Sequence, residues 1–427
     1  MLGTLLCLTA CVDTLDQFPT NIASADSLED FTGVLNASYF YQHAGVTPMA
    51  VMGDFRADNA LMEEEPYPSF DRYNGDLVDM EDQFFSPFYT GMYKSILSAN
   101  NVIENSTSAT QIGEAKFLRA LSYFKLVRVF GPVPINLSAT PSTTDNSILE
   151  RQPVADVYNV VISDFQDAIS ALDNSGLSSG RATSIAAQGL LGKVYMQLGD
   201  FGNAASQLAG VVSGAAGAGI SLQADFANIF GVDNDLNSEI IYATQVSSSI
   251  SDEYGFSEFW SWSAGLDTKS LMPLDPDLIV AFDASPGDLR RAVTINEELM
   301  ASPKFPQTGG PDHDWIELRL ADAILLYAEA LNETGNSAGA LTELNKVRAR
   351  AGLGDSTAGS QGEIRQAIAD ERRLELAFEG QRWFDLVRTG TVDAEMGQTI
   401  DSRYHLFPVP ISEVLASFGV ITQNDGY

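Results

Sequence analysis

Aromatic residues are concentrated in one short stretch of the chain, from Tyr254 to Trp262. Five of its nine residues carry rings: Tyr254, Phe256, Phe259, Trp260 and Trp262. The C–H faces of a sugar ring stack on exposed aromatic rings, while neighbouring polar side chains exchange hydrogen bonds with its hydroxyls. The stretch therefore predicts a carbohydrate platform led by Trp260 and Trp262, with Tyr254 and Phe259 beside them. An equally open alternative is that Phe256, Phe259 and Trp260 pack the stretch onto helices, because large aromatic side chains are mostly buried.

A second loop combines rings with polar groups. Residues 67–73 read Tyr-Pro-Ser-Phe-Asp-Arg-Tyr, and Asp58 and Asn59 lie upstream. Proline disfavours a helix in this region, so we expect these residues to form a loop. We predict Tyr67 and Tyr73 as further ligand contacts.

Other kinds of chemistry find little support in the sequence. The three histidines are isolated from one another: His43, His313 and His405. The run 312–314, Asp-His-Asp, is more typical of a turn and helix cap than of a metal cluster. The segment from Asp233 begins like a calcium loop, but Ser238 replaces its glycine and Thr244 its bidentate glutamate. Since phosphate loops and nucleophile elbows are absent as well, we predict no catalytic residue, metal or cofactor.

The only two cysteines, Cys7 and Cys11, lie near the start of the chain. The apolar residues before Cys11 are typical of the back half of a secretory signal and are too short to span a bilayer. The order Leu-Thr-Ala-Cys at residues 8–11 resembles a bacterial lipobox, in which cleavage before the cysteine frees its sulfur for lipidation. We therefore predict a signal-peptide remnant at 1–10, lipidation of Cys11 and a tether at 11–26. The alternative is that Cys11 is a small buried residue of a first helix; no Lys or Arg precedes the apolar run.

The chain is strongly acidic. Its 427 residues include 24 Lys and Arg against 57 Asp and Glu, which gives a net charge of -33. Such a surface repels nucleic acid and anionic membranes, so we predict no nucleic-acid partner and membrane contact only through the lipid anchor. A neutral glycan fits this charge better than a sulfated one, although Lys269, Arg290 and Arg291 could serve an anionic sugar locally.

Hydrophobic periodicity predicts a mostly α fold with long irregular loops and few strands. The clearest stripe is Phe84, Phe88, Met92 and Ile96 at four-residue spacing in a helix over 80–103. Further helices are expected at 27–41, 117–130, 154–172, 184–198, 203–212, 315–331, 338–350 and 363–378. Capping-box spacing begins two of them, at Asp314-x-x-Glu317 and Ser360-x-x-Glu363. The best strand candidate is 240–244.

Two helix pairs resemble one another at a constant offset of 136 residues. The matching positions are Leu190, Gly192, Gly199, Ala204, Leu208 and Val211 with Leu326, Ala328, Gly335, Ala340, Leu344 and Val347. Small residues at the crossing and glycine after the first helix suit tetratricopeptide-like hairpins. Ordinary antiparallel hairpins of a bundle explain these residues equally well.

Several blocks, taken together, resemble a known family. They are the helix and turn at 113–134, the helix pair regions 186–199 and 320–352, the run Glu-Arg-Arg-Leu-Glu-Leu-Ala-Phe-Glu-Gly at 371–380, Arg-Trp-Phe-Asp-Leu at 382–386 and Leu-Phe-Pro-Val-Pro at 406–410. In this order they are similar to the SusD/RagB-like nutrient-binding lipoproteins of the outer membrane.

The resemblance implies a single globular domain over 27–427, built on tetratricopeptide-like hairpins and held at the outer membrane by lipid. It also implies a SusC-like TonB-dependent transporter as partner, over which the protein acts as a lid that delivers a glycan. Such proteins bind and do not hydrolyse. By this reading the charged and aromatic residues of the matching blocks are scaffold.

One charge in the helix over 363–378 is predicted to face the interior, because the apolar stripe passes through Glu371 or Arg372. A buried charge must be paired. We expect Glu371 to pair with Arg119 or Arg382 from another of the matching blocks.

Two other functions stay open at this stage. A helical glycoside hydrolase would need two carboxylates flanking a cleft, and a chain this acidic can neither reveal nor exclude such a pair by sequence. A tetratricopeptide-like scaffold for peptides or proteins would be indifferent to the loss of Trp260 and Trp262.

Overall fold

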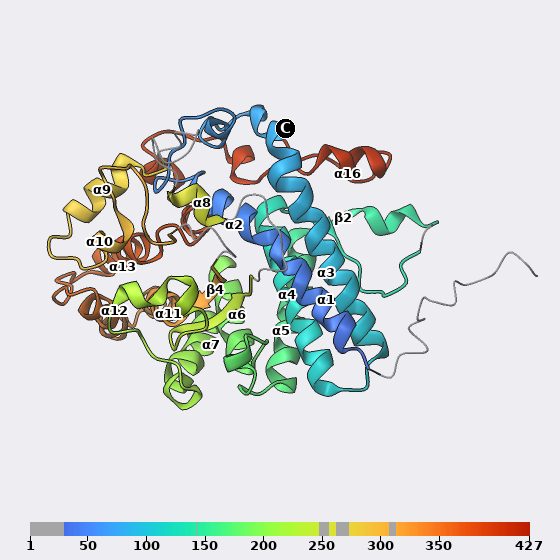
Figure 1. Cartoon of the computed structure of the whole chain (residues 1–427), viewed down its shortest axis with the longest axis horizontal. Coiled ribbons are helices and arrows are strands. Elements are labelled where there is room, and N and C mark those ends of the chain that lie inside the picture. Colours follow the sequence, from blue (N-terminus) through green and yellow to red (C-terminus); the bar gives the residue numbers. More distant parts are fainter. Residues whose placement is uncertain (1–29, 143, 247–255, 262–272, 307–312) are drawn as a thin grey trace, which may run out of the picture.

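Helices make up most of the chain, as the sequence predicts (Figure 1). The computed structural model describes residues 30–142, 144–246, 256–261, 273–306 and 313–427. The first half of the chain contains α1 (Thr32–Gln42), α2 (Val46–Asp54), α3 (Ser86–Asn105), α4 (Ala109–Phe130), α5 (Val154–Ala171), α6 (Ser184–Gln197) and α7 (Phe201–Gly214). The second half contains α8 (Phe256–Ser261), α9 (Pro276–Asp283), α10 (Arg291–Thr294), α11 (Leu320–Glu333), α12 (Ser337–Arg350), α13 (Gln361–Leu376), α14 (Arg382–Thr389), α15 (Val392–Glu395) and α16 (Ile411–Ala416).

The helices α1, α3, α4 and α5 form one side of the molecule, where neighbours in sequence pack side by side (Figure 1). The predicted stripe holds, because Phe88, Met92 and Ile96 on α3 are fully buried against this layer. Phe84 precedes them in a π-helical turn, η5 (Glu81–Phe85). The helix α4 ends where the sequence predicts, at Gly131, whose φ of 71° suits glycine.

The two helix pairs related by 136 residues are both hairpins, α6–α7 and α11–α12, and α11 packs against α7. Equivalent residues cap their second helices: Asp200 accepts from Asn203 N, and Asn336 accepts from Gly339 N. A side chain on Gly192 would clash, because its Cβ would lie 2.6 Å from Leu208. Close helix crossing therefore explains this small residue, and the predicted hairpins are confirmed.

Two small antiparallel sheets complete the fold. One pairs β1 (Val133–Pro134) with β2 (Arg151–Gln152), and the other pairs β3 (Ile240–Thr244) with β4 (Trp315–Arg319). The predicted strand at 240–244 is confirmed.

The predicted helix start at Asp314 is wrong, because residues 315–319 are extended and α11 begins at Leu320. Pairing with β3 satisfies the backbone of β4 and buries the whole strand. Asp314 does not cap a helix; its carboxylate accepts from Val246 N at 2.8 Å. The second capping box, Ser360 with Glu363 at the start of α13, is confirmed.

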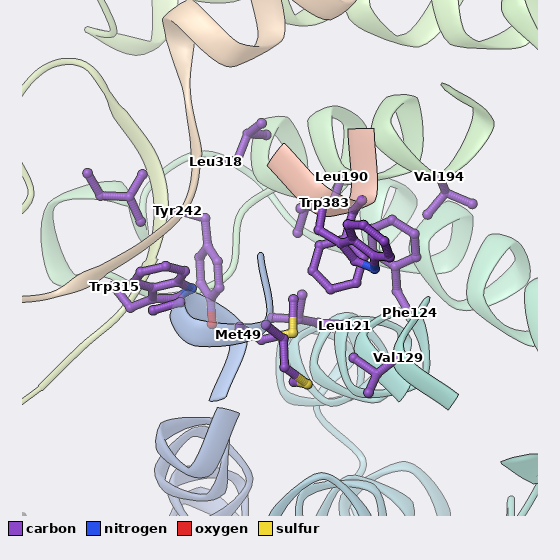
Figure 2. Close-up of a cluster of buried hydrophobic side chains, with 14 of the residues drawn as sticks. Met49, Leu121, Phe124, Val129, Leu190, Val194, Tyr242, Trp315, Leu318 and Trp383 are labelled. Carbon is purple, nitrogen blue, oxygen red and sulfur yellow. The ribbon is translucent and has the colours of Figure 1, made fainter. Parts of the chain in front are cut away.

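The core joins the helical layers to the larger sheet. Figure 2 shows side chains from α2, α4, α6, β3, β4 and α14 pointing toward one another, among them Met49, Leu121, Tyr242, Trp315 and Trp383. All of these are buried. The short helix α2 thus links the N-terminal layer to the C-terminal third.

Glu371 is buried and paired, as predicted, but its predicted partners are wrong. Its carboxylate lies 2.7 Å from Arg290 and 3.0 Å from Arg348. Arg119 instead pairs with Asp164, and Arg382 pairs with Asp58. Helix α13 faces α12 and the segment before α10, so its charges find arginines there.

Glu371 belongs to a larger group, which we call the ionic core: Arg290, Arg319, Arg348, Arg350, Lys304, Asp288, Glu239, Glu371, Glu375 and Glu379. The Arg319 guanidinium contacts Glu239, Glu375 and Glu379. Surrounding arginines hold the pKa of the Glu375 carboxyl well below its usual range, although burial alone would raise it. The Glu375 carboxylate therefore keeps its charge while excluded from water.

Candidate functional site

The two aromatic stretches singled out by the sequence meet in space. Phe259 on α8 makes an edge contact with Tyr67 at 5.7 Å between ring centroids. It also contacts Phe55 at 6.1 Å and Phe84 at 5.9 Å. Tyr67 begins the short helix η3 (Tyr67–Phe70). We call Phe55, Tyr67, Phe84, Phe259 and Trp260 the aromatic cluster.

Trp260 fills the space between α2 and the turn that follows α13. Its ring lies 4.7 Å from Phe55 and 5.0 Å from Phe378, between centroids. Its Nε1 is buried, and the described residues supply no hydrogen-bond partner for it. Its carbonyl accepts from Ser302 N at 2.8 Å. Apolar packing therefore holds this side chain.

The turn after α13 can approach α2 because two glycines face each other there. A Cβ on Gly53 would lie 2.2 Å from the carbonyl of Gly380, so no larger residue fits at position 53. Asp54, the last residue of α2, accepts from Gly380 N at 2.6 Å and from Phe378 N at 3.2 Å. Burial raises the pKa of Asp54 to about 6.

The prediction of a solvent-exposed platform does not hold for the rings of the aromatic cluster. Phe259 and Trp260 are 0% exposed and Tyr67 is 5% exposed. The physical reason is that α8 lies against α2, where burying two large rings stabilises the fold more than leaving them in water. These three side chains form the base of the region.

Tyr254 and Trp262, which flank α8 in the chain, lie outside the described residues. Their contact with a ligand stays a prediction. The packing of Phe259 and Trp260 fixes α8 in place, and the chain continues from its two ends toward Tyr254 and Trp262.

Tyr73 belongs to a neighbouring group. Its ring stacks on Trp383 at 5.8 Å, and its hydroxyl donates to the carbonyl of Arg56 at 2.8 Å. The guanidinium of Arg56 lies 4.8 Å from the ring centroid and donates to the Phe70 and Tyr404 carbonyls. Tyr73 is partly buried and fixed from both sides, so it is part of the frame in this structure.

Two carboxylates lie beside these rings. Burial raises the pKa of Asp71 well above its ordinary value, and the negative charge of Asp275 adds to the effect. Burial also raises the pKa of Asp275. Such groups accept hydrogen bonds from hydroxyls when ionised and donate one when protonated. The sequence placed Asp71 in the second aromatic loop, but no sequence signal brought Asp275 to it.

A separate cavity of about 260 Å³ lies beside α13 and α14. Five arginines line it: Arg365, Arg372, Arg373, Arg382 and Arg388. Each is matched by an acid; Arg372, for example, pairs with Asp322 and Asp385, and Arg388 with Glu329. Its charges are therefore satisfied within the protein.

Metal-binding clusters and membrane-spanning helices are both absent from the described residues. In the described ranges, no group of three or more His, Cys, Asp or Glu is arranged to hold a metal ion. Across the same ranges, no helix is long and apolar enough to cross a membrane.

Two family profiles match separate parts of the chain. The SusD family matches residues 290–427, and a family described as "Starch-binding associating with outer membrane" matches residues 13–196. The chain belongs to the SusD/RagB-like family.

Relatives of the family align over most of the chain. The SusD-like protein P2 of Formosa agariphila is 26% identical, and the alignment covers 99% of this chain and 98% of the relative. The starch-binding protein SusD of Bacteroides thetaiotaomicron is 22% identical over 78% of this chain and 76% of its own.

Solved SusD-like structures share the fold. A laminarin-binding SusD-like protein is 25% identical, with a TM-score of 0.76 over 93% of this chain and 99% of its own. A SusD superfamily protein from Bacteroides thetaiotaomicron is 25% identical, with a TM-score of 0.78 over 94% of this chain and 100% of its own. SusD-like proteins are carbohydrate-binding proteins, and the family is associated with the outer membrane.

Sequence reasoning missed most of the residues that hold this SusD-like region together. Phe55 and Arg56 follow α2 directly and give no sequence signal of their own. Phe84 was recognised only as part of a helical stripe. Their roles come from tertiary contacts, which no local pattern specifies.

Proposed function

We propose that this SusD-like protein captures a neutral glycan at the cell surface and closes over a SusC-like TonB-dependent transporter that takes the glycan up. The observation that carries the proposal is the full-length similarity to SusD-like proteins, one of which binds laminarin. Lipid on Cys11 would anchor the protein to the outer membrane, with residues 11–26 as tether to a domain over 27–427. Transport energy would come from the partner.

The ligand would lie over the aromatic cluster. Tyr254 and Trp262 are its proposed stacking residues, because the chain reaches them directly from the ends of α8. Asp71 and Asp275 lie on the neighbouring side and would exchange hydrogen bonds with sugar hydroxyls. The buried rings beneath would fix the geometry and so reduce the entropy lost on binding.

Affinity electrophoresis across laminarin, starch and sulfated polysaccharides tests the proposal. We expect retardation by a neutral polysaccharide and a marked reduction of this retardation in the Tyr254→Ala/Trp262→Ala variant. A matched control is Phe418→Ala, which removes an aromatic ring that is 91% exposed on the C-terminal segment. Absence of retardation by every polysaccharide, or an unchanged shift in the double variant, would contradict the proposed site.

The anchor and the partner need separate tests. Cys11→Ala should move the full-length precursor from the outer-membrane fraction to the soluble fraction of the cell envelope. Purification of the anchored protein should recover a SusC-like barrel. Retention of the variant in the membrane would contradict anchoring through lipid on Cys11. Recovery of the protein without a barrel would contradict the partnership with a SusC-like transporter.

A glycoside hydrolase is the second candidate, and the elevated pKa values of Asp71 and Asp275 favour it. Chromatography of laminarin and starch after incubation with the protein discriminates. We expect no shortened products. Products that disappear with Asp71→Asn would contradict a binding-only role.

A further inference from the structure

A groove on the outer side of α3 has the chemistry of a binding site. Its volume is about 280 Å³, and none of its lining residues belongs to α8 or to the loop 67–73. The main contributors are Tyr89, Tyr93 and Leu97 from α3, Pro134 from β1, and Glu413 and Ile421 from the C-terminal segment. Figure 1 shows α16 and β2 on this side of α3.

The floor of the groove is apolar and held in place. Tyr89 and Tyr93 lie one helical turn apart, with ring centroids separated by 4.7 Å. The Tyr93 hydroxyl donates to the carbonyl of Pro134 at 2.8 Å, and Tyr89 packs against Phe130 at 5.5 Å. Because these rings are already oriented, a ligand that packs on them does not have to restrict their side-chain motion, and little conformational entropy is lost on binding.

Glu413 supplies an unusual polar group at this floor. It is partly buried, and the described residues give its carboxylate no hydrogen-bond or ion-pair partner. Its position is fixed, because Glu81 accepts from the backbone N–H groups of Ile411 and Ser412 and so holds the start of α16. Burial and the charge of Glu81 raise the pKa of Glu413. An unpaired carboxylate in such a place is stabilised by any occupant that donates a hydrogen bond.

The lining selects a neutral occupant. Among the described residues that line it, Lys94 is the one cation and Glu413 the one anion, so these residues carry no net charge that would favour a charged ligand. The apolar floor is bordered by the Lys94 ammonium as a donor, the Glu413 carboxylate as an acceptor and the hydroxyl of Thr90. This arrangement matches a sugar ring, which has an apolar face and a polar edge.

We propose that this groove is a second carbohydrate site, which binds a ring of a neutral glycan between Tyr93 and Glu413. The proposal rests on the proposed function, since it takes the same class of ligand. Two sites on one chain would hold a long glycan by two weak contacts, and the second contact would form at a high effective concentration.

Titration calorimetry with laminarihexaose and maltohexaose tests the groove. We expect the wild-type protein to bind two molecules of one of these sugars per chain. Thr90→Arg fills the groove from a partly buried surface position and should leave one molecule per chain. Glu413→Gln keeps the shape and should weaken the second event about tenfold. The matched control is Ala416→Arg, which adds the same charge at an exposed position of α16 outside the lining.

The outcomes separate this proposal from the proposed function. One molecule per chain in both wild type and Thr90→Arg would overturn the groove and leave glycan capture intact. If neither hexasaccharide nor any polysaccharide binds, glycan capture itself fails. If Thr90→Arg leaves sugar stoichiometry unchanged but abolishes recovery of a protein partner, the groove is a protein-docking surface and the proposal is wrong. Loss of one site in Thr90→Arg but not in Ala416→Arg would support it.

Discussion

The ionic core and the aromatic cluster are both buried, yet they are held in opposite ways. In the ionic core each cation contacts one or more carboxylates, and Arg290 and Arg319 contact three each. In the aromatic cluster Trp260 is held by rings, and its Nε1 has no hydrogen-bond partner among the described residues. Buried charges require particular partners, whereas packed rings require shape.

This difference assigns the two regions different tasks. The ionic core fixes β4, α12 and α13 relative to one another, because its pairs join these elements. The aromatic cluster instead supports the ends of α8, beside the residues proposed to meet the glycan. Ion pairs therefore hold the frame of the protein together, whereas packed aromatic rings support the helix next to the proposed ligand site.

The largest expected effect is the loss of a central cation from the ionic core. Arg319→Met leaves Glu239, Glu375 and Glu379 without their shared partner and should lower the free energy of unfolding by about 3–5 kcal/mol. Urea denaturation measures the change. Arg403→Met, which breaks an exposed pair with Asp401, should lower the free energy of unfolding far less, because water and salt screen that pair. Equal losses in the two variants would show that the ionic core is not a stabilising unit.

Asp54, which precedes Phe55 of the aromatic cluster, and Glu375 of the ionic core should make pH-dependent contributions to stability of opposite sign. Burial raises the pKa of Asp54 from 3.8 to about 6, so the folded protein binds more protons than the unfolded chain between these values. Asp54 therefore favours folding less as pH rises through that window, and its contribution is constant above it. Glu375, whose pKa is lowered, favours folding less as pH falls through and below its ordinary value of 4.5.

Denaturation of wild type and Asp54→Asn from pH 4 to pH 7 isolates the first of these effects. The stability of the variant relative to wild type should rise with pH by about 1–3 kcal/mol across the window. A constant difference between the two proteins would mean that Asp54 is ionised throughout in the folded state.

A smaller effect is expected from Trp260→Phe. The substitution removes ring volume but no hydrogen bond of the described residues, so it should cost about 1–2 kcal/mol. Trp383→Phe also loses the bond from Nε1 to the His405 carbonyl and should cost more. Thermal unfolding of both variants checks the order; the reverse order would contradict the account of Trp260 as held by packing alone.

The sequence predicted most of the frame because helices are encoded locally. The stripe on α3, the stop at Gly131 and the paired hairpins each follow from periodicity or from a glycine. The strand β4 was misread as a helix start, because its partner β3 lies far away in sequence and only pairing reveals it. The apolar stripe of α13 correctly predicted that Glu371 is buried. Its partners, Arg290 and Arg348, could not be predicted because they depend on how the helices pack.

The candidate site was predicted only in part. The sequence located the rings of both aromatic stretches but could not tell exposed rings from buried ones, since composition carries no direction. Phe259, Trp260 and Tyr67 face inward, and Tyr73 is clamped by Arg56 and Trp383. The proximity of Asp275 to Asp71 arises from tertiary folding alone.

The most direct test of glycan capture beside α8 uses a hexasaccharide of the polysaccharide that retards the protein in affinity electrophoresis. Its dissociation constant is measured for the wild type, for Tyr254→Ala/Trp262→Ala and for Trp260→Phe. We predict that Tyr254→Ala/Trp262→Ala weakens its binding to the α8-side site at least about tenfold relative to wild type, whereas Trp260→Phe changes it by less than about threefold. A double variant that binds as tightly as wild type would contradict the account.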